Sequence, residues 1–96
     1  MAELQVVDNP SASRYEILAD GQVAGFVTYS ILADRMVLIH TEVRPEFEGH
    51  GVGAALAAGV LDDLRRRGLR VVPRCPYIAA YIDKHPGYQD LVVRPT

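Results

Sequence analysis

The chain has 96 residues, of which 49% are hydrophobic and 23% are charged, and its formal net charge at pH 7 is -2. This length suits one small domain with a single core, and the composition is that of a globular protein rather than a disordered one. The near-neutral charge excludes a general attraction to nucleic acid or to anionic membranes, so we expect neither as a partner.

Cysteine and histidine usage indicates a reducing compartment and no bound metal. The single cysteine, Cys75, cannot form a disulfide within the chain, and histidines 40, 50 and 85 do not follow a zinc-binding spacing. The opening stretch, MAELQVVDNP, has neither the basic lead nor the long apolar run of a signal peptide or membrane anchor. We therefore expect a cytoplasmic protein.

The N-terminal half predicts an antiparallel meander. Residues 1–12 run into the turn-forming cluster DNPSAS, residues 8–13, and are expected to form a tether or a short edge strand. Apolar residues alternate along residues 14–19, and the Asp-Gly pair at 20–21 is a strong hairpin signal before a second strand at 23–32. Because this second strand has apolar residues at both parities, we expect it to be covered on both sides. The β-branched run MVLIHTEV, residues 36–43, predicts a third strand that ends before a proline.

The C-terminal half predicts a strand-helix-strand unit and a second helix. Beyond Gly51 apolar residues recur every four positions, and Gly68 is placed to end the helix. Residues 69–75 return to a strand that stops near Pro73 and Pro76. Residues 77–85 predict a short helix, and residues 86–92 a turn followed by a helical or extended piece. The apolar stripe of the first helix comprises Val52, Leu56, Val60 and Leu64. The fold class is therefore α/β (α+β): an antiparallel meander that continues into a βαβ unit, with a mixed sheet and two main helices.

The segment EFEGHGVGAAL, residues 46–56, places three glycines at alternate positions where the first helix begins. A helix N-terminus presents unpaired N–H groups and about half a positive charge, so it attracts anions, and glycines let the backbone come close. The loop leaves the carboxyl end of a parallel strand, where α/β sheets usually bind ligands. It predicts a pyrophosphate cradle, the alternative being a tight strand-to-helix turn. Neither the dinucleotide pattern GxGxxG nor a Walker A loop fits this spacing.

The stretch VRPEFEGHGVGAAL resembles the acetyl-CoA-binding segment of the GCN5-related N-acetyltransferase (GNAT) superfamily. That pattern, Arg or Gln, two residues, Gly, one residue, then Gly or Ala, falls on Glu48, Gly51 and Gly53, so an acid stands where the family has Arg or Gln. The wider strings IHTEVRPEFEGHGVGAAL and VVPRCPYIAAYIDKHPGYQDLV are similar to the minimal single-domain branch of the superfamily. We therefore expect one GNAT-like acyl-CoA-binding domain over residues 1–96.

The resemblance implies acetyl-CoA, or another acyl-CoA, as the co-substrate. Pantetheine would pair with the backbone at residues 41–43, and the diphosphate would lie on residues 49–54. The residues expected to bind the cofactor are Thr41, Val43, Glu48, Gly49, His50, Gly51, Val52, Gly53 and Ala54. Longer members of the family carry N-terminal helices that shape an acceptor pocket, for which this chain has no room. The amine acceptor, a small molecule or a protein, would be held by a partner, by a second copy in a homodimer, or only loosely.

Direct acyl transfer needs a proton acceptor for the attacking amine, and candidates should lie at the carboxyl ends of the parallel strands. Glu42 and His40 share one strand face by the period of two, so both are expected to point into the same side of the crevice. We take Glu42 as the first candidate for the base, through a water molecule if needed, and His40 as the second. The alternative is that one of them hydrogen-bonds within the sheet and the other is solvated.

Cys75 and Tyr77 are the remaining catalytic candidates. The Cys75 thiol ends the second parallel strand, where it would be a donor that lines the site, a nucleophile that forms an acyl-enzyme, or a small buried hydrophobe. Tyr77 would protonate the departing CoA thiolate, or would belong to a packing stripe with Tyr81.

The primary hypothesis is an acyl-CoA-dependent N-acetyltransferase that acts on an unidentified amine. One alternative is a CoA-binding or protein-interaction module with little catalysis, which would bind acetyl-CoA without turnover. The other is a Cys75-dependent transfer through a covalent acyl-enzyme, which would add an acetyl group to the intact mass of the protein.

Overall fold

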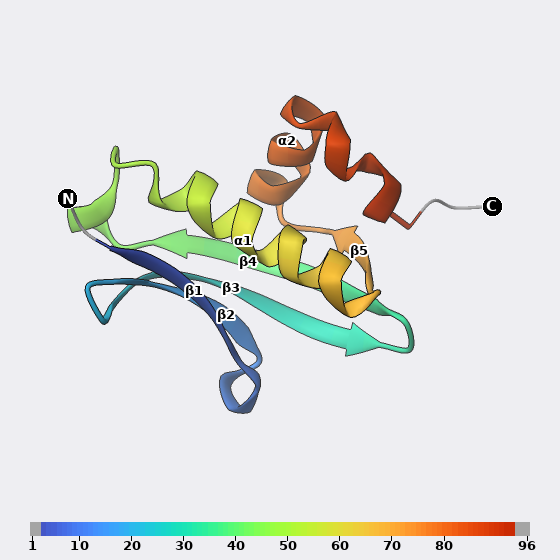
Figure 1. Cartoon of the computed structure of the whole chain (residues 1–96), viewed down its shortest axis with the longest axis horizontal. Coiled ribbons are helices and arrows are strands. Elements are labelled where there is room, and N and C mark those ends of the chain that lie inside the picture. The colour runs from blue at the N-terminus through green and yellow to red at the C-terminus, as the bar shows by residue number, and fades with distance from the viewer. Residues whose placement is uncertain (1–2, 94–96) are drawn as a thin grey trace.

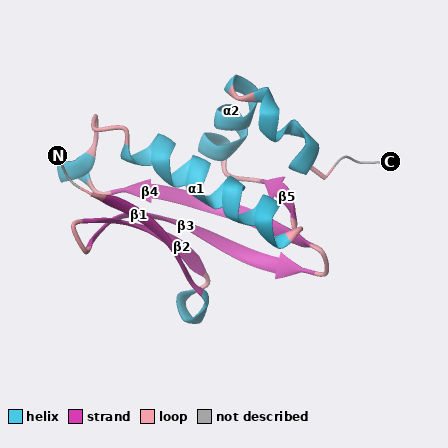
Figure 2. Cartoon of the chain, in the orientation of Figure 1, coloured by secondary structure: helices cyan, strands magenta, loops and turns pink. Residues whose placement is uncertain are grey.

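Five strands form one mixed sheet, and helices α1 (Val52–Arg67) and α2 (Pro76–Lys84) lie on one side of it (Figures 1 and 2). The computed structural model describes residues 3–93. The elements in chain order are β1 (Leu4–Asn9), η1 (Pro10–Ala12), β2 (Arg14–Ala19), β3 (Gln22–Leu32), β4 (Arg35–Val43), η2 (Pro45–Phe47), α1 (Val52–Arg67), β5 (Arg70–Pro73), α2 (Pro76–Lys84) and η3 (Pro86–Leu91), where η denotes a 3-10 helix.

The strands lie in sequence order from β1 to β5. Neighbours from β1 to β4 pair antiparallel, whereas β4 and β5 are parallel and are connected through α1. This arrangement confirms the predicted meander followed by a βαβ unit. The first segment forms the edge strand that was one of its two expected outcomes.

Glycines bound the long helix α1. The N-cap Gly51 has φ 75° and the C-cap Gly68 has φ 72°, a left-handed conformation that favours glycine. The N–H group of Gly68 donates to the carbonyls of Arg65 and Leu64, which ends the helix as the sequence predicts. The predicted apolar stripe is buried at all four positions: Val52, Leu56, Val60 and Leu64. No helix within residues 3–93 is both long and apolar enough to cross a lipid bilayer.

The strand after α1 stops at the first of the two prolines near which it was expected to end. β5 ends at Pro73, and Cys75 is already the N-cap of α2, because Pro76 stands in the first turn, where its missing N–H group costs nothing. After α2, η3 leads Val92 into a parallel bridge with Val71. The last segment is therefore helical first and extended afterwards.

The core lies between the covered face of the sheet and the two helices. Its largest fully buried side chains come from β2 to β5, α1 and α2: Tyr15, Ile17, Val27, Met36, Leu38, Leu56, Val60, Leu61, Leu64, Val71 and Ile78. Burial of these side chains ties the beginning of α1 to the end of β4, where the candidate site lies.

Neither α1 nor α2 lies on the second face of the sheet, so the expected cover on both sides of β3 is wrong (Figure 1). A bulge explains why β3 has apolar residues at both odd-numbered and even-numbered positions. The register places Val23 opposite Leu18 but Gly25 opposite Ile17, which leaves Ala24 as an extra residue. The alternation shifts at this point, and Ala24 faces the core fully buried. We call this side, opposite α1 and α2, the bare face.

Polar side chains fix the end of α1 to the sheet. The Tyr15 hydroxyl donates to Asp63 Oδ2 at 2.5 Å and accepts from Arg67 Nη1 at 2.8 Å. The Tyr29 hydroxyl donates to Asp8 Oδ1 at 2.6 Å, and Asp8 also contacts Arg67. Burial raises the pKa of Tyr15, and the hydrogen bond to Asp63 raises it further. These contacts hold α1 over β1 to β3 while its first turn faces β4.

Candidate acyl-CoA site

The two parallel strands part at Leu38. The pairing of β4 with β5 ends with Leu38 opposite Pro73, and the last link is the Cys75 N–H group, which donates to the Leu38 carbonyl at 2.9 Å. The chain then turns into α2, so within residues 3–93 the stretch 39–43 has no strand partner on its β5 side. The parting leaves an open backbone edge on β4.

A second bulge decides which side chains face this opening. The register places Leu38 opposite Tyr29 but His40 opposite Thr28, so Ile39 is an extra residue of β4. Beyond it, Thr41 and Val43 face the helices, as the 3.0 Å contact of Thr41 Oγ1 with the Cys75 sulfur shows.

His40 and Glu42 share one face, as the sequence predicts, but this is the bare face. The His40 ring meets Phe26 edge-on at 6.4 Å between centroids, and His40 Nε2 lies 3.4 Å from Glu42 Oε1. Both side chains are mostly exposed. Their face is therefore opposite the one on which Thr41, Val43 and Cys75 lie.

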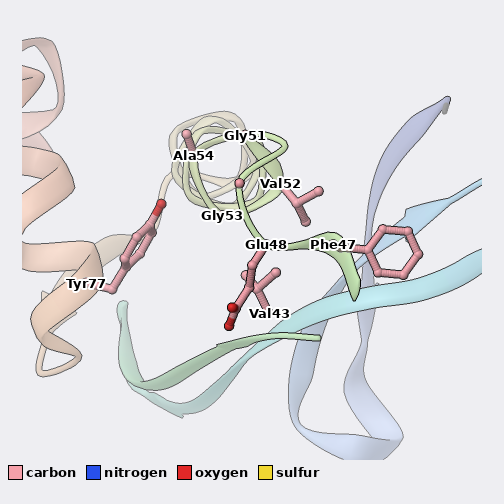
Figure 3. A pocket seen from close by; sticks show the side chains of 9 residues that line it. Val43, Phe47, Glu48, Gly51, Val52, Gly53, Ala54 and Tyr77 are labelled. Carbon is pink, nitrogen blue, oxygen red and sulfur yellow. The ribbon is translucent and has the colours of Figure 1, made fainter. Parts of the chain in front are cut away.

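A pocket of about 240 Å³ opens on the helix-covered side, between the end of β4, the turn into α1 and the start of α2 (Figure 3). Its lining is mainly apolar, with backbone from the glycine turn. The lining residues are Val43, Phe47, Glu48, Gly49, Gly51, Val52, Gly53, Ala54 and Tyr77. The pocket therefore joins the open edge of β4 to the N-terminus of α1.

The glycine turn exposes the N-terminus of α1. Gly49 and Gly51 have φ 82° and 75°, and there is open space where a Cβ would stand on either. No side chain caps the helix at Gly51, so the N–H groups of its first turn are left for another partner. Such amides, together with the helix dipole, favour an anion.

Tyr77 packs directly on the first turn of α1. A Cβ built on Gly53 would lie only 2.6 Å from the Tyr77 hydroxyl, so the absent side chain makes room for the ring. Figure 3 shows the Tyr77 ring and the Glu48 side chain on opposite sides of the space beneath this turn. Burial raises the pKa of Tyr77, and the neighbouring Tyr81 raises it further, so its hydroxyl stays protonated and able to donate.

The structure gathers most of the residues expected to bind the cofactor around this pocket. Thr41 and His50 are the exceptions: Thr41 contacts Cys75, and His50 is exposed in the turn without lining the pocket. Among the catalytic candidates Tyr77 lines the pocket, whereas Cys75 is buried at the parting point and does not. Which of these residues bind or react stays a prediction.

Phe47 is a lining residue that sequence reasoning missed. It lies in η2, directly before the glycine turn, and is partly buried against the core. An aromatic residue among the charged and glycine positions of EFEGHG was the available signal.

Comparisons with known proteins give the family. Residues 14–91 match the model of the GCN5-related N-acetyl-transferase family. Among curated proteins, the [ribosomal protein bS18]-alanine N-acetyltransferase of Escherichia coli K12 is 27% identical over 55 residues, which are 57% of this chain and 37% of that protein. The match thus spans little more than a third of that relative.

Two solved structures share the fold. A GCN5-like protein from Staphylococcus aureus has a TM-score of 0.71 at 22% identity, over 100% of this chain and 94% of that one. The S18-alanine N-acetyltransferase of Escherichia coli has a TM-score of 0.64 at 18% identity, over 91% of this chain and 77% of that one. Because the family model covers most of the chain, including the parting strands and the glycine turn, this protein belongs to the GCN5-related N-acetyltransferase family.

Proposed function

We propose that this chain transfers an acetyl group from acetyl-CoA to an amine. Family membership implies acetyl-CoA as the co-substrate. The observation that carries the proposal is the pocket itself, which lies where β4 leaves β5 and ends at the uncapped N-terminus of α1. A site of this shape offers an anion cradle, an apolar wall and an open strand edge in one continuous path.

Each part of acetyl-CoA has matching groups along that path. The amides of residues 49–54 would hold the diphosphate, since no side chain caps the helix end and open space surrounds the Cβ positions of Gly49 and Gly51. The backbone at residues 41–43 would pair with pantetheine as an added strand does, with Val43 and Phe47 as apolar wall. The volume, about 240 Å³, is below the usual range of about 300–1,000 Å³ for drug-sized ligands, so the pocket would enclose only part of the molecule.

The attacking amine would arrive from the bare face. Helices α1 and α2 and the buried Cys75 fill the covered side of the parting point, whereas Glu42 and His40 are exposed on the other side. The amine nitrogen forms the new bond to the thioester carbon while the carbon–sulfur bond breaks. The Glu42 carboxylate, or His40 as second candidate, takes the amine proton directly or through water, and the leaving thiolate gains a proton from Tyr77 or solvent.

A route through an acyl-enzyme at Cys75 is the competing mechanism. The short contact between Thr41 Oγ1 and the Cys75 sulfur places the thiol at the parting point. However, Cys75 is only 3% exposed and does not line the pocket, so attack on a bound thioester would require the thiol to move. Direct transfer needs no such movement, and we favour it for that reason.

Binding and turnover test the proposal separately. Titration calorimetry with acetyl-CoA should show saturable binding, and the amide NMR signals of residues 49–54 should shift with the same affinity. Release of free CoA thiol with a panel of amines should follow, and Glu42→Gln should lower kcat about 100-fold or more with an unchanged acetyl-CoA affinity, as for loss of a general base.

Glu46→Gln removes an exposed carboxylate of η2 that does not line the pocket and serves as the matched control. Saturable binding without turnover would leave a CoA-binding module. Unmoved signals at residues 49–54 would reject the site itself.

A further inference from the structure

The bare face carries an ordered array of polar and aromatic side chains beside the parting point. Register places Glu16, Phe26 and Glu42 opposite one another in one row across β2, β3 and β4. Arg14 and His40 stand in the next row, each opposite the same residue of β3. The cofactor pocket uses none of these five residues.

Arg14 is held in one orientation. Its Nε donates to Glu16 Oε2 at 2.8 Å, and its Cζ lies 4.5 Å from the centre of the Phe26 ring. Glu16 is itself buried, with 8% exposure, and also accepts a hydrogen bond from Asn9 Nδ2 at 3.1 Å. The hydrogen bonds from Arg14 and then Asn9 lower the pKa of Glu16, which keeps it a carboxylate. The guanidinium is thus fixed by an anion on one side and a ring below it.

The free edge of that guanidinium is available for a ligand. Within residues 3–93, Glu16 is the sole carboxylate partner of Arg14, and it takes only Nε, which leaves both Nη groups to bind another anion. A planar guanidinium with two free donors fits a carboxylate in bidentate geometry. The Arg14 side chain is 29% exposed, so an incoming group can reach it.

The carboxylate of Glu42 lies on the other side of Phe26 from Arg14. Glu42 is on the strand next to Phe26 and is 59% exposed. Phe26 is on β3, between Arg14 on β2 and Glu42 on β4, and adjacent strands are about 4.8 Å apart. A ligand that lies over Phe26 would therefore contact both Arg14 and Glu42. A ligand that complements this pair has a carboxylate and an amine a few bonds apart. The carboxylate would accept from Arg14 and the amine would donate to Glu42, each over a hydrogen bond of about 2.8 Å.

The pKa of the attacking amine narrows the choice of acceptor. A lysine side chain has a pKa of about 10.4, whereas a chain N-terminus has one of about 7.7–8.0 and is partly neutral at neutral pH. An exposed carboxylate such as Glu42 is therefore better suited to the chain N-terminus, because a larger fraction of that amine is already neutral and ready to attack. The flat, exposed surroundings of Glu42 and His40 offer little to enclose a free metabolite, whereas an extended polypeptide can continue over the sheet.

We infer that the acceptor is the N-terminus of a polypeptide with an acidic side chain at its second or third position, and that Arg14 binds this carboxylate while the amine faces Glu42. This inference rests on the proposed function for its reaction. The binding of the carboxylate by Arg14 can be measured without turnover, so the two can fail separately.

The experiment compares amidated peptides that differ in one group. Ala-Glu-Ala-Ala and Ala-Ala-Glu-Ala are each paired with the peptide in which glutamine replaces glutamate, and kcat/KM is measured at low salt. At least one glutamate peptide should be favoured about tenfold, the effect of one partly exposed charge-assisted contact. Arg14→Gln should bring the ratio near one, and Arg14→Lys, which keeps the charge without the planar fork, should retain only part of the preference.

Arg35→Gln is the matched control, because Arg35 lies at the far end of β4 and pairs with Asp34. The glutamate preference should persist in this variant. Circular dichroism and acetyl-CoA affinity verify that each Arg14 variant is folded.

Binding of the products gives the readout that needs no turnover. The N-acetylated glutamate peptide should shift the Arg14 Nε–H signal and bind about tenfold more tightly than its glutamine counterpart. That result without turnover of any amine would keep the inference and reject the proposed function. Equal use or equal binding of the paired peptides, an unchanged ratio in Arg14→Gln, or a preference for free glutamate over the peptides would overturn the inference.

Discussion

Gly53 and Tyr77 leave no room between them for a single carbon atom. A Cβ on Gly53 would lie 2.6 Å from the hydroxyl oxygen and 3.0 Å from the ring carbon that bears it. The contact joins the first turn of α1 to α2, and both residues line the pocket. The absence of a side chain at position 53 therefore sets the position of the Tyr77 ring.

Gly53→Ala is expected to weaken acetyl-CoA binding with little loss of stability. The new methyl group displaces the end of the flexible Tyr77 side chain, while alanine gains up to about 1 kcal/mol of helix propensity. We expect an affinity for acetyl-CoA about 3- to 10-fold lower, measured by calorimetry, because the ring shifts within the pocket. The double variant Gly53→Ala/Tyr77→Ala should recover part of the loss.

Gly59→Ala is the matched comparison on the same helix. A Cβ on Gly59 would meet Val6 at 2.5 Å and 2.8 Å, and the short β-branched side chain of β1 cannot swing away. Overpacking of this kind costs about 1–3 kcal/mol, which should exceed the propensity gain and lower the free energy of unfolding in urea. If the Gly59 variant were more stable than the Gly53 variant, this account of α1 packing would be wrong.

Glu48→Gln should strengthen acetyl-CoA binding. Glu48 lines the pocket next to the glycine turn, so its carboxylate would repel a bound diphosphate. Two like charges about 6 Å apart in a water-like medium repel by about 0.7 kcal/mol, and a diphosphate carries more than one charge. We expect a 3- to 10-fold lower dissociation constant, with a difference from the wild type that shrinks as salt is added. An unchanged affinity would place the diphosphate away from Glu48.

Tyr29 should make stability fall at alkaline pH. Burial, and then the hydrogen bond to Asp8, raise the pKa of Tyr29 to about 12, although the charge of Arg67 acts in the opposite direction. An unfolded tyrosine titrates at about 10, so the protonated folded form contributes fully below that pH and loses its contribution between about pH 10 and 12.

Urea unfolding at several pH values checks this contribution. The wild type should be more stable than Tyr29→Phe at pH 8, by about 2 kcal/mol, and the two should converge toward pH 12. A stability difference that stayed constant over this range would contradict the assignment. Tyr15 titrates in the same direction and remains present in both proteins, so the difference between them reports mainly on Tyr29.

Cys75→Ser should retain acetyl transfer if transfer is direct. The hydroxyl replaces a thiol that contacts Thr41 Oγ1 and lies away from the pocket lining, so we expect kcat to fall less than about tenfold. Intact mass spectrometry of the wild type after incubation with acetyl-CoA should show no acetyl adduct. A stable adduct that disappears in Cys75→Ser, together with loss of turnover, would establish the covalent route instead.

Helix boundaries and strand order followed from local rules in the sequence. The stripe that begins at Val52 needs only the helical period. Gly51 bounds α1 at its N-terminus and Gly68 at its C-terminus, because each adopts a positive φ. The crossover through α1 then makes β4 and β5 parallel. These features depend on short windows of sequence, which is why they could be predicted.

The sides of the strands could not be predicted in the same way. Uninterrupted alternation from Leu38 would send His40 and Glu42 toward the helices, but the extra residue Ile39 sends them to the bare face. Nothing local to Ile39 marks a bulge, because its position depends on pairing with β3. Arg14 was missed for the same reason, since its contact with Phe26 depends on the pairing of β2 with β3.

The bulge at Ile39 has a consequence for protein engineering. Deletion of this one residue, with pairing to β3 kept on both sides, would invert the end of β4. Thr41 would then leave Cys75 for solvent, while Glu42 would turn toward α1 and α2. The count of residues in β4, rather than their identity, decides which side chains lie on the bare face and which face the helices. Insertions or deletions between Leu38 and Val43 should therefore exchange the side chains of the two faces, whereas substitutions there should leave each position on its own face.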